Sequence, residues 1–319
     1  MKLNKVLLFL ALFLLASAVL SPLSVCAVEP IETQRECELI IEFVHNGRPV
    51  EGISVSIYRF ADVSANGDVT LCGKFADYPI DISGDSAQKH HALAQTLNVF
   101  AKKDQLKPDV QTKIDEYGFA TVKNLRPGMF LIASERYEDE DGVFFLSPSI
   151  VSIPAKLSEE GEWLYSVRIL PKCTYRSDGR PAVIEKKVQK IWRDEGCEAD
   201  RPNSIEVALL RNGRVYQTVK LHAMNGWSYS WKNLSAKDEW LLAEMHPEGY
   251  MVMISDDGKV TSIYNTREPQ TPPPDQPPPE EPDIPDTGML WWPLPVLAVL
   301  GVVLILAGTA MGRGKRNEA

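Results

Sequence analysis

Cysteine and histidine are the residue types in this sequence that most readily hold metals or form covalent links. Four cysteines lie beyond the N-terminal apolar run: Cys37, Cys72, Cys173 and Cys197. In an oxidising compartment they can form disulfides, with three possible connectivities between which the sequence does not choose. No two of them have the spacing of a zinc site, and no cluster of histidines accompanies them. We therefore expect no metal and no cofactor.

Other arrangements that would indicate an enzyme are also missing from the sequence, which shows no Ser-His-Asp order, metal cluster or phosphate-binding loop. His90 and His91 are adjacent on a predicted helix, where a solvent-facing position is favoured over metal binding. The net charge of −9 at pH 7 argues against nucleic acid as a partner. An enzyme is therefore the least favoured class of function.

The N-terminal apolar run has the features of an export signal. Two lysines precede the run, which ends in the small residues Val25-Cys26-Ala27. This pattern predicts a secretory signal peptide over residues 1–27, cleaved after Ala27. Cys26 would also allow a lipoprotein signal, but Val25 is a poor residue before a lipidated cysteine. We therefore expect a mature, exported chain.

The C-terminal apolar run has the features of a membrane span. Residues 290–311 include no charge and are long enough to cross a bilayer as a helix. Basic residues follow in the tail, 312–319, which we expect to stay in the cytoplasm. The preceding segment, EPQTPPPDQPPPEEPD at residues 268–283, should form an extended stalk because it is rich in proline. The stalk would hold the rest of the chain away from the membrane.

The region between the two ends is long enough for about two domains, which we expect at residues 28–175 and 183–267. Short alternating runs, such as ISVSIYRF at 53–60 and SIEVALL at 204–210, predict half-buried strands. The tripeptide NGR, at Asn46 and again at Asn212, predicts tight hairpin turns. The expected fold class is all-β, with two immunoglobulin-like sandwiches in tandem and a C-terminal transmembrane helix.

One helix is predicted inside the first domain. Asp85 can cap its start, and Gln88 can close a capping box. Its apolar stripe is made of Leu93, Leu97, Phe100 and Ala101.

The two domains share an internal repeat. KNLRPGMFLIASE ends at Glu135 and KNLSAKDEWLLAE ends at Glu244, with the same spacing from Asn to Glu. Upstream, ISVSIYR at 53–59 corresponds to IEVALLR at 205–211. We therefore expect two copies of one fold, the first carrying the predicted helix as an insertion.

A further pattern lies in the second domain, where residues 186–266 include KIW, RPNSIEVALLRNG, NGWSYSWKNL, EGY and IYNT. These stretches resemble the Cna B-type domains of Gram-positive surface proteins and pilins. The C-terminus resembles the LPXTG sorting signal, with the residues Ile284, Pro285, Asp286, Thr287 and Gly288. The resemblance implies that a sortase cysteine attacks Thr287, separates it from Gly288 and passes the acyl group to an amine. Otherwise, this pentapeptide is the end of a linker before a membrane anchor.

The resemblance also implies a covalent cross-link inside the second domain. In the family, a Lys on the first strand joins an Asn on the last with the help of an acid, and the matching residues are Lys190, Asn265 and Glu244. Burial would leave Lys190 neutral and Glu244 protonated, as the chemistry requires. Trp192 could help to exclude water. The alternative is an ordinary ion pair between Lys190 and Glu244.

The first domain should lack this cross-link. No lysine lies between Val28 and Gly73, and the predicted last strand, WLYSVRIL, contains no asparagine. Glu135 keeps the position of the acid, and we expect it to be a surface charge.

WLYSVRILPK, ending at Lys172, resembles a pilin motif whose lysine receives the acyl group of the next subunit. Leu170 departs from the motif, as does Cys173 after it. Alternatively, the stretch is a last strand running into a linker.

These features favour a sortase-processed, wall-anchored pilus subunit, most readily the basal one, over a monomeric wall-anchored adhesin. The chain would be a sortase substrate and not an enzyme, apart from autocatalytic formation of its isopeptide bond. The partners implied are sortase and the peptidoglycan precursor or wall, with other pilin subunits or a host ligand as further candidates.

Overall fold

The structure is a computed structural model of the 319-residue chain. It describes residues 29–84, 86–140, 142–156, 162–177, 183–245 and 248–267. These residues belong to one compact unit, which has two β lobes, residues 29–177 and 183–267. Several expected features lie outside the described residues: the signal peptide (1–27), the stalk (268–283), the sorting motif (284–288), the membrane span (290–311) and the basic tail (312–319).

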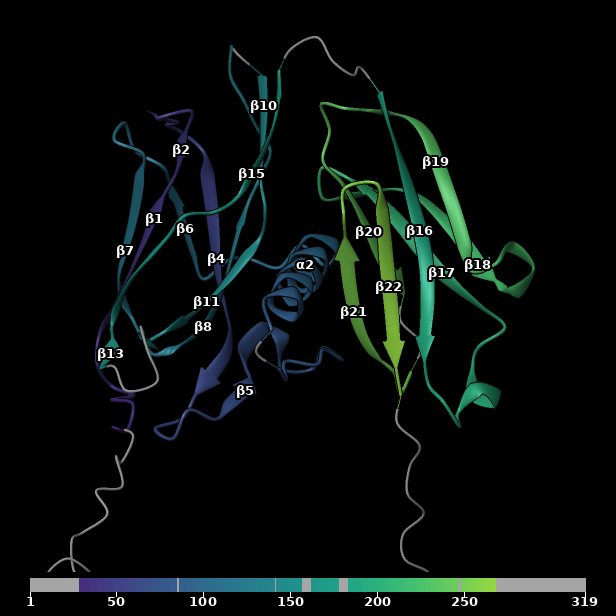
Figure 1. Cartoon of the computed structure of the whole chain (residues 1–319), viewed down its shortest axis with the longest axis horizontal. Helices are drawn as coiled ribbons and strands as arrows, with labels where there is room; N and C mark the ends of the chain where they lie inside the picture. The colour runs from purple at the N-terminus through teal and green to yellow at the C-terminus, as the bar shows by residue number, and fades with distance from the viewer. Residues whose placement is uncertain are drawn as a thin grey trace, which may run out of the picture. The chain divides into compact units, whose positions relative to one another are not determined.

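The first lobe has two principal sheets, which pack around a shared apolar core (Figure 1). One has the strand order β14-β1-β7, and the other has the order β11-β8-β4-β5, with β6 also paired to β4. The strands of the first sheet are β1 (Cys37–Glu42), β7 (Phe119–Leu125) and β14 (Ser166–Ile169). Those of the second are β4 (Ser54–Val63), β5 (Val69–Leu71), β6 (Val110–Lys113), β8 (Gly128–Ser134) and β11 (Ser149–Ile153).

Shorter strands complete this lobe. A three-stranded sheet has the order β15-β10-β9, and two pairs are formed by β2 with β3 and by β12 with β13. Their bounds are β2 (Val44–His45), β3 (Arg48–Pro49), β9 (Tyr137–Glu138), β10 (Gly142–Leu146), β12 (Ala155–Lys156), β13 (Trp163–Leu164) and β15 (Cys173–Ser177).

The second lobe is a smaller two-sheet structure. Its sheets have the orders β19-β16-β22-β21 and β18-β17-β20. The strands are β16 (Val183–Arg193), β17 (Ser204–Arg211), β18 (Arg214–His222), β19 (Ser228–Ser235), β20 (Trp240–Met245), β21 (Met251–Asp256) and β22 (Val260–Thr266). Short 3-10 turns lie at η2 (Glu198–Asp200) and η3 (Ala223–Asn225), and the first lobe has one at η1 (Gly73–Phe75).

The lobes share the arrangement that the sequence repeat suggested. In the first lobe β1 lies parallel to β14, the last strand but one, and in the second lobe β16 lies parallel to β22, the last strand. The repeated KNL segments also share a local geometry, because Asn124 and Asn233 have φ values of 59° and 58°. Asparagine tolerates this left-handed conformation better than most residues. The described residues are thus mostly β with one α-helix, as predicted.

The helix is α2 (Ala87–Lys103), and its apolar stripe is buried as predicted. The cap was predicted wrongly. Ser86 is the N-cap, and its hydroxyl accepts a hydrogen bond from the Lys89 backbone N–H at 3.2 Å. Ser86 has the extended backbone of an N-cap residue, so Lys89, not Gln88, occupies the third helical position and no capping box forms. Asp85 lies outside the described residues.

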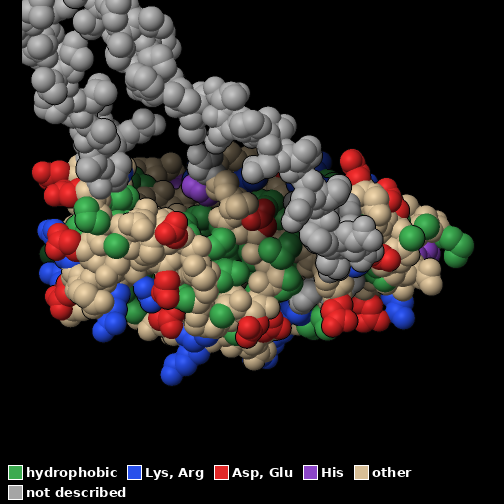
Figure 2. Space-filling view, turned by 90° about the horizontal axis from the view of Figure 1, so that it is seen from below, with side chains coloured by type: hydrophobic (Ala, Val, Ile, Leu, Met, Phe, Trp, Pro, Cys, Tyr) green, Lys and Arg blue, Asp and Glu red, His purple; other side chains and the backbone are tan. Residues whose placement is uncertain are grey.

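Other expectations for exposed positions and turns are confirmed. His90 and His91 of α2 are both exposed. Both NGR turns use left-handed backbone, with φ values of 50° at Asn46 and 49° at Asn212, each followed by a glycine of positive φ. Over the described residues on the face shown in Figure 2, acidic and basic side chains are interspersed and form no large area of one sign. No helix of the described residues has both the length and the apolar character of a membrane span.

The four cysteines that could have formed disulfides are not paired in the structure. All four are free thiols, and each lies in a different part of the fold. Cys37 begins β1 and Cys173 begins β15, whereas Cys72 precedes η1 and Cys197 precedes η2. Burial raises the pKa of the Cys37 and Cys72 thiols to about 11, so neither is a reactive thiolate at neutral pH.

Candidate functional site

Three strands of the second lobe bring Lys190, Glu244 and Asn265 together. Lys190 lies on β16 and Asn265 on the neighbouring parallel strand β22, where Lys190 pairs with Ile263 and Trp192 pairs with Asn265. Alternate residues of both strands are buried, so Lys190 and Asn265 point to the same side, into the core. Glu244 enters from β20 in the other sheet. The sequence predicted this group of residues, and the structure places all three at one point in the core.

The three side chains are removed from solvent. Lys190 is 3% exposed, and Glu244 and Asn265 are 0% exposed. The amide Nδ2 of Asn265 donates a hydrogen bond of 2.9 Å to Oε1 of Glu244. The amine Nζ of Lys190 lies 3.8 Å from Oε2 of Glu244, which is longer than a hydrogen bond, and donates to the carbonyl oxygens of Ile191 and Ile263 at 3.3 Å.

Two oxygen atoms of this group have no hydrogen-bond partner, Oε2 of Glu244 and Oδ1 of Asn265. A buried acceptor without a partner is costly, so this is not the arrangement expected of a settled ionic cluster. Protonation of Glu244 would supply the missing donor, because its O–H can donate a hydrogen bond. Turning the Asn265 amide by 180°, which exchanges its oxygen and nitrogen, would then direct Oδ1 towards this donor.

Burial favours the neutral forms of both titratable groups. It lowers the pKa of Lys190 from 10.5 to about 8, although the negative charges of Glu244 and Asp194 oppose this shift. Burial likewise raises the pKa of Glu244, against the nearby charge of Lys190. A neutral amine is a nucleophile and a neutral carboxyl is an acid, so both groups shift towards the forms that can react.

Aromatic rings cover the amine. Nζ of Lys190 lies 4.2 Å from the ring centroid of Trp192. Trp227 and Tyr250 pack edge-on against Trp192, with centroids 5.2 Å from it. These rings separate the amine from water. The sequence suggested this role for Trp192.

Asp194 is a neighbour that the sequence did not indicate. It is 1% exposed and accepts hydrogen bonds from Nε of Arg201 at 2.8 Å and from the Tyr250 hydroxyl at 3.1 Å. The hydrogen bonds from Arg201 hold the pKa of Asp194 below its usual value, so a negative charge remains near Lys190. In the sequence Asp194 looks like an ordinary polar residue after a strand, and only its burial reveals the contact.

The first lobe provides no matching group among its described residues. Glu135, at the position equivalent to Glu244 in the repeat, is exposed as expected. The fully buried side chains of β1 are those of Leu39 and Ile41, neither of which offers an amine.

Lys172 lies outside these sites, on the segment between β14 and β15. Its side chain is exposed, while its carbonyl oxygen accepts a hydrogen bond of 2.8 Å from the Ser147 backbone N–H. The amine is thus accessible on a fixed backbone, and its use as a pilin lysine stays a prediction.

One family model matches part of the chain. Residues 186–266 match the model of the Cna protein B-type domain. The second lobe is therefore a Cna B-type domain, and the resemblance read from the sequence is confirmed for this segment. No curated protein matches the sequence.

Solved structures with some similarity are surface proteins and pilins. One is a single B repeat unit of the collagen-binding surface protein Cna of Staphylococcus aureus, with 14% identity, 74% of this chain and 100% of that chain covered, and a TM-score of 0.26. Another is GBS52, the minor pilin of Streptococcus agalactiae, with 15% identity, coverages of 76% and 100%, and a TM-score of 0.26. The full-length major pilin SpaD of Corynebacterium diphtheriae has 15% identity, coverages of 76% and 66%, and a TM-score of 0.30. Scores this low carry no further argument.

Proposed function

We propose that this chain is a secreted, wall-anchored surface protein whose Cna B-type domain closes an isopeptide bond between Lys190 and Asn265. The observation that carries the proposal is the burial of an amine, a carboxyl and an amide at one point, on the first strand, the facing sheet and the last strand of one domain. Burying a titratable amine and a carboxyl costs folding free energy. In this proposal the burial serves the reaction, because it favours the neutral forms of both groups.

The bond would form by exchange of one amide for another. Neutral Lys190 attacks the side-chain carbonyl carbon of Asn265 through Nζ, while protonated Glu244 donates a hydrogen bond to Oδ1 and stabilises the developing negative charge. Glu244 then relays a proton from Nζ to the amide nitrogen of Asn265. The carbon–nitrogen bond to that nitrogen breaks, ammonia leaves and Glu244 is restored. No oxidant or cofactor is consumed.

The link would suit a protein that bears load. It would join β16 to β22, the first and last strands of the lobe, so that these strands cannot separate when the ends of the domain are pulled. A tether of this kind agrees with the sorting tag and proline-rich stalk in the sequence, through which sortase would attach Thr287 to the wall.

We further propose that the protein is a pilus subunit, in the basal position. The exposed amine of Lys172 supports this role, since a pilin needs an accessible acceptor. A monomeric adhesin that binds a host ligand is the second candidate. It is favoured by Cys173, which stands where the pilin motif has Asn. Cys173 is partly buried and lies opposite Leu146 in the pairing of β15 with β10.

The intact mass of the purified chain tests the bond. Loss of one ammonia should make the wild-type protein about 17 Da lighter than its sequence mass. Lys190→Ala removes the nucleophile and Glu244→Ala removes the acid, so both variants should keep their full mass. A wild-type protein of full mass would show that the three residues are only a buried polar cluster.

A further inference from the structure

The helix of the first lobe contacts the outer edge of the sheet that contains Lys190 and Asn265. In the order β19-β16-β22-β21, strand β21 is at the edge, beside the Asn265 strand. Its outward amides are nevertheless bonded. The N–H of Val252 donates to the Pro79 carbonyl at 2.7 Å, that of Ile254 to Oγ1 of Thr96 at 2.8 Å, and that of Asp256 to Oε1 of Gln95 at 3.0 Å. We call these bonds the edge contact.

Gln95 and Thr96 of α2 act in the edge contact much as a neighbouring strand would. The Gln95 amide also donates to the carbonyl of Asp256 at 2.8 Å, so it bonds both backbone groups of one residue. The Thr96 hydroxyl, which is fully buried, gives its own hydrogen to the Ala92 carbonyl at 2.7 Å and keeps its oxygen free to accept. These bonds fix the orientation of the Gln95 amide and of the Thr96 hydroxyl relative to β21.

The edge contact is aligned with the proposed site. Across the three strands, Trp192, Asn265 and Val252 form one row, and Lys190, Ile263 and Ile254 form the next. The third row is Val188, Thr261 and Asp256. The N–H at the β21 end of each row donates to one acceptor of the edge contact. The acceptor is Pro79 for the Asn265 row, Thr96 for the Lys190 row and Gln95 for the third row.

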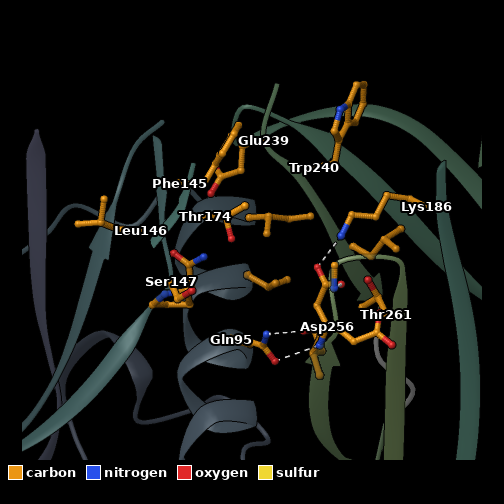
Figure 3. A pocket seen from close by; sticks show the side chains of 18 of the residues that line it. Gln95, Phe145, Leu146, Ser147, Thr174, Lys186, Glu239, Trp240, Asp256 and Thr261 are labelled. Carbon is orange, nitrogen blue, oxygen red and sulfur yellow. Dashed lines mark hydrogen bonds and ion pairs between the residues drawn. The ribbon is translucent and has the colours of Figure 1, made fainter. Parts of the chain in front are cut away.

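Hydrogen bonds must hold this end of β21, because packing is incomplete there. A cavity of about 400 Å³ opens between α2 and the second lobe, and its lining includes Gln95, Asp256 and Lys186. Figure 3 shows Gln95 and Lys186 reaching Asp256 from opposite sides. The amine of Lys186 lies 2.6 Å from Oδ2 of Asp256.

We propose that Thr96 and Gln95 are positioning residues for the cross-link between Lys190 and Asn265. They fix the register of β21, which in turn holds β22 so that the Asn265 amide stays beside Glu244 and within reach of the amine. The role rests on the proposed isopeptide bond. It makes the helical insertion of the first lobe part of the machinery that closes the bond in the second.

The test measures how fast the bond forms in cells that express the full chain. After an isotopic pulse, samples are denatured at intervals and digested with trypsin, and the branched peptide that joins residues 188–193 to residues 260–267 is quantified by mass spectrometry. Thr96→Val keeps the shape but removes the acceptor of the Ile254 N–H, so bond formation should slow by about threefold to tenfold. Thr96→Ser restores the hydroxyl and should restore the rate.

Two further variants separate positioning from general stability. Gln95→Met should also slow the reaction, and it decides the question if Thr96→Val does not accumulate, because Gln95 is only partly buried. Lys102→Met is the matched control. It breaks the contact of α2 with Glu239, 2.6 Å away in the second lobe, but touches none of the three rows. Its rate should equal that of the wild type.

The outcomes are distinct. Wild-type rates in both Thr96→Val and Gln95→Met would overturn the role of the helix and leave the cross-link standing. Equal slowing in Lys102→Met would overturn it too, since contact between the lobes would then be all that matters. Absence of the branched peptide from the wild type would overturn the cross-link itself, and this role with it.

Discussion

Asn265 lies opposite Trp192, and not opposite Lys190, in the parallel pair of β16 and β22. The Lys190 amine must therefore extend along the strand by two residues, about 7 Å, to meet the Asn265 amide. The long stem of lysine allows this reach, which a shorter amine would not. The proposed bond would run diagonally between the strands, so sliding one strand past the other would load a covalent bond as well as the hydrogen bonds.

The first prediction concerns stability. Glu244→Gln keeps the volume of the side chain but cannot supply the acid, so the bond should not form. Closing a loop of most of the domain contributes about 4 kcal/mol by analogy with disulfides. The variant should therefore melt about 10 °C lower by calorimetry and be cleaved sooner by trypsin.

Glu135→Gln is its matched control, because Glu135 has the same place in the repeat but is exposed in the first lobe. It should melt like the wild type. Equal melting of Glu244→Gln and wild type would contradict a stabilising bond.

The second prediction concerns pH. Asn265→Ala cannot form the bond and leaves Lys190 with a free, buried amine. Burial lowers the Lys190 pKa from 10.5 to about 8, so between these values the unfolded chain binds more protons than the folded chain. The free energy of unfolding should rise with pH across this window, by about 2 kcal/mol between pH 8 and pH 10.

Urea unfolding at the two pH values measures this change. The double variant Lys190→Met/Asn265→Ala is the reference, because it lacks the Lys190 amine and keeps the other titratable groups. Glu244 has a raised pKa, so its own titration acts in the opposite direction. The same pH dependence in both proteins would show that Lys190 is not buried as an amine.

The third prediction concerns pilus assembly. Lys172→Arg keeps the charge but removes the nucleophile, since arginine stays protonated at neutral pH. High-mass ladders of wall extracts on denaturing gels should disappear, while folding and wall attachment persist. Lys123→Arg alters another exposed lysine and should leave the ladders intact. Ladders that survive in Lys172→Arg would assign the acceptor to a different amine, and a single wall-bound band in the wild type would favour the adhesin.

The fourth prediction concerns anchoring. Thr287→Ala alters the residue at which sortase would form its acyl-enzyme, so the protein should remain in the membrane fraction. Thr271→Ala, in the stalk, is the control and should be sorted normally. Fractionation after lysozyme digestion measures both. Release of Thr287→Ala with the wall material at wild-type levels would remove the sorting proposal.

The sequence predicted much of the candidate site, because a family pattern marks Lys190, Glu244 and Asn265. Periodicity predicted the strands and the buried stripe of α2. The sequence placed the cap one residue too early, at Asp85, because Asp85 and Ser86 are both good capping residues and only the backbone at Ser86 identifies it as the cap.

Contacts that no family pattern or periodicity marks could not be predicted. Asp194 looks like a surface acid until Arg201 and Tyr250 are seen to enclose it. Thr96 looks like an ordinary helix residue, and nothing in the sequence says that its hydroxyl meets Ile254, on a strand of the other lobe. The number of cysteines likewise does not show whether they lie close enough to pair, and the four in the described residues are free.

The edge contact on β21 also bears on solubility. An unpaired edge strand invites a strand from another molecule, which is a common first step towards aggregates. On β21 the amides of Val252, Ile254 and Asp256 are already taken by the same chain, so an incoming strand would find no donors at these positions. The inserted helix would then keep neighbouring molecules from fusing their sheets along this edge.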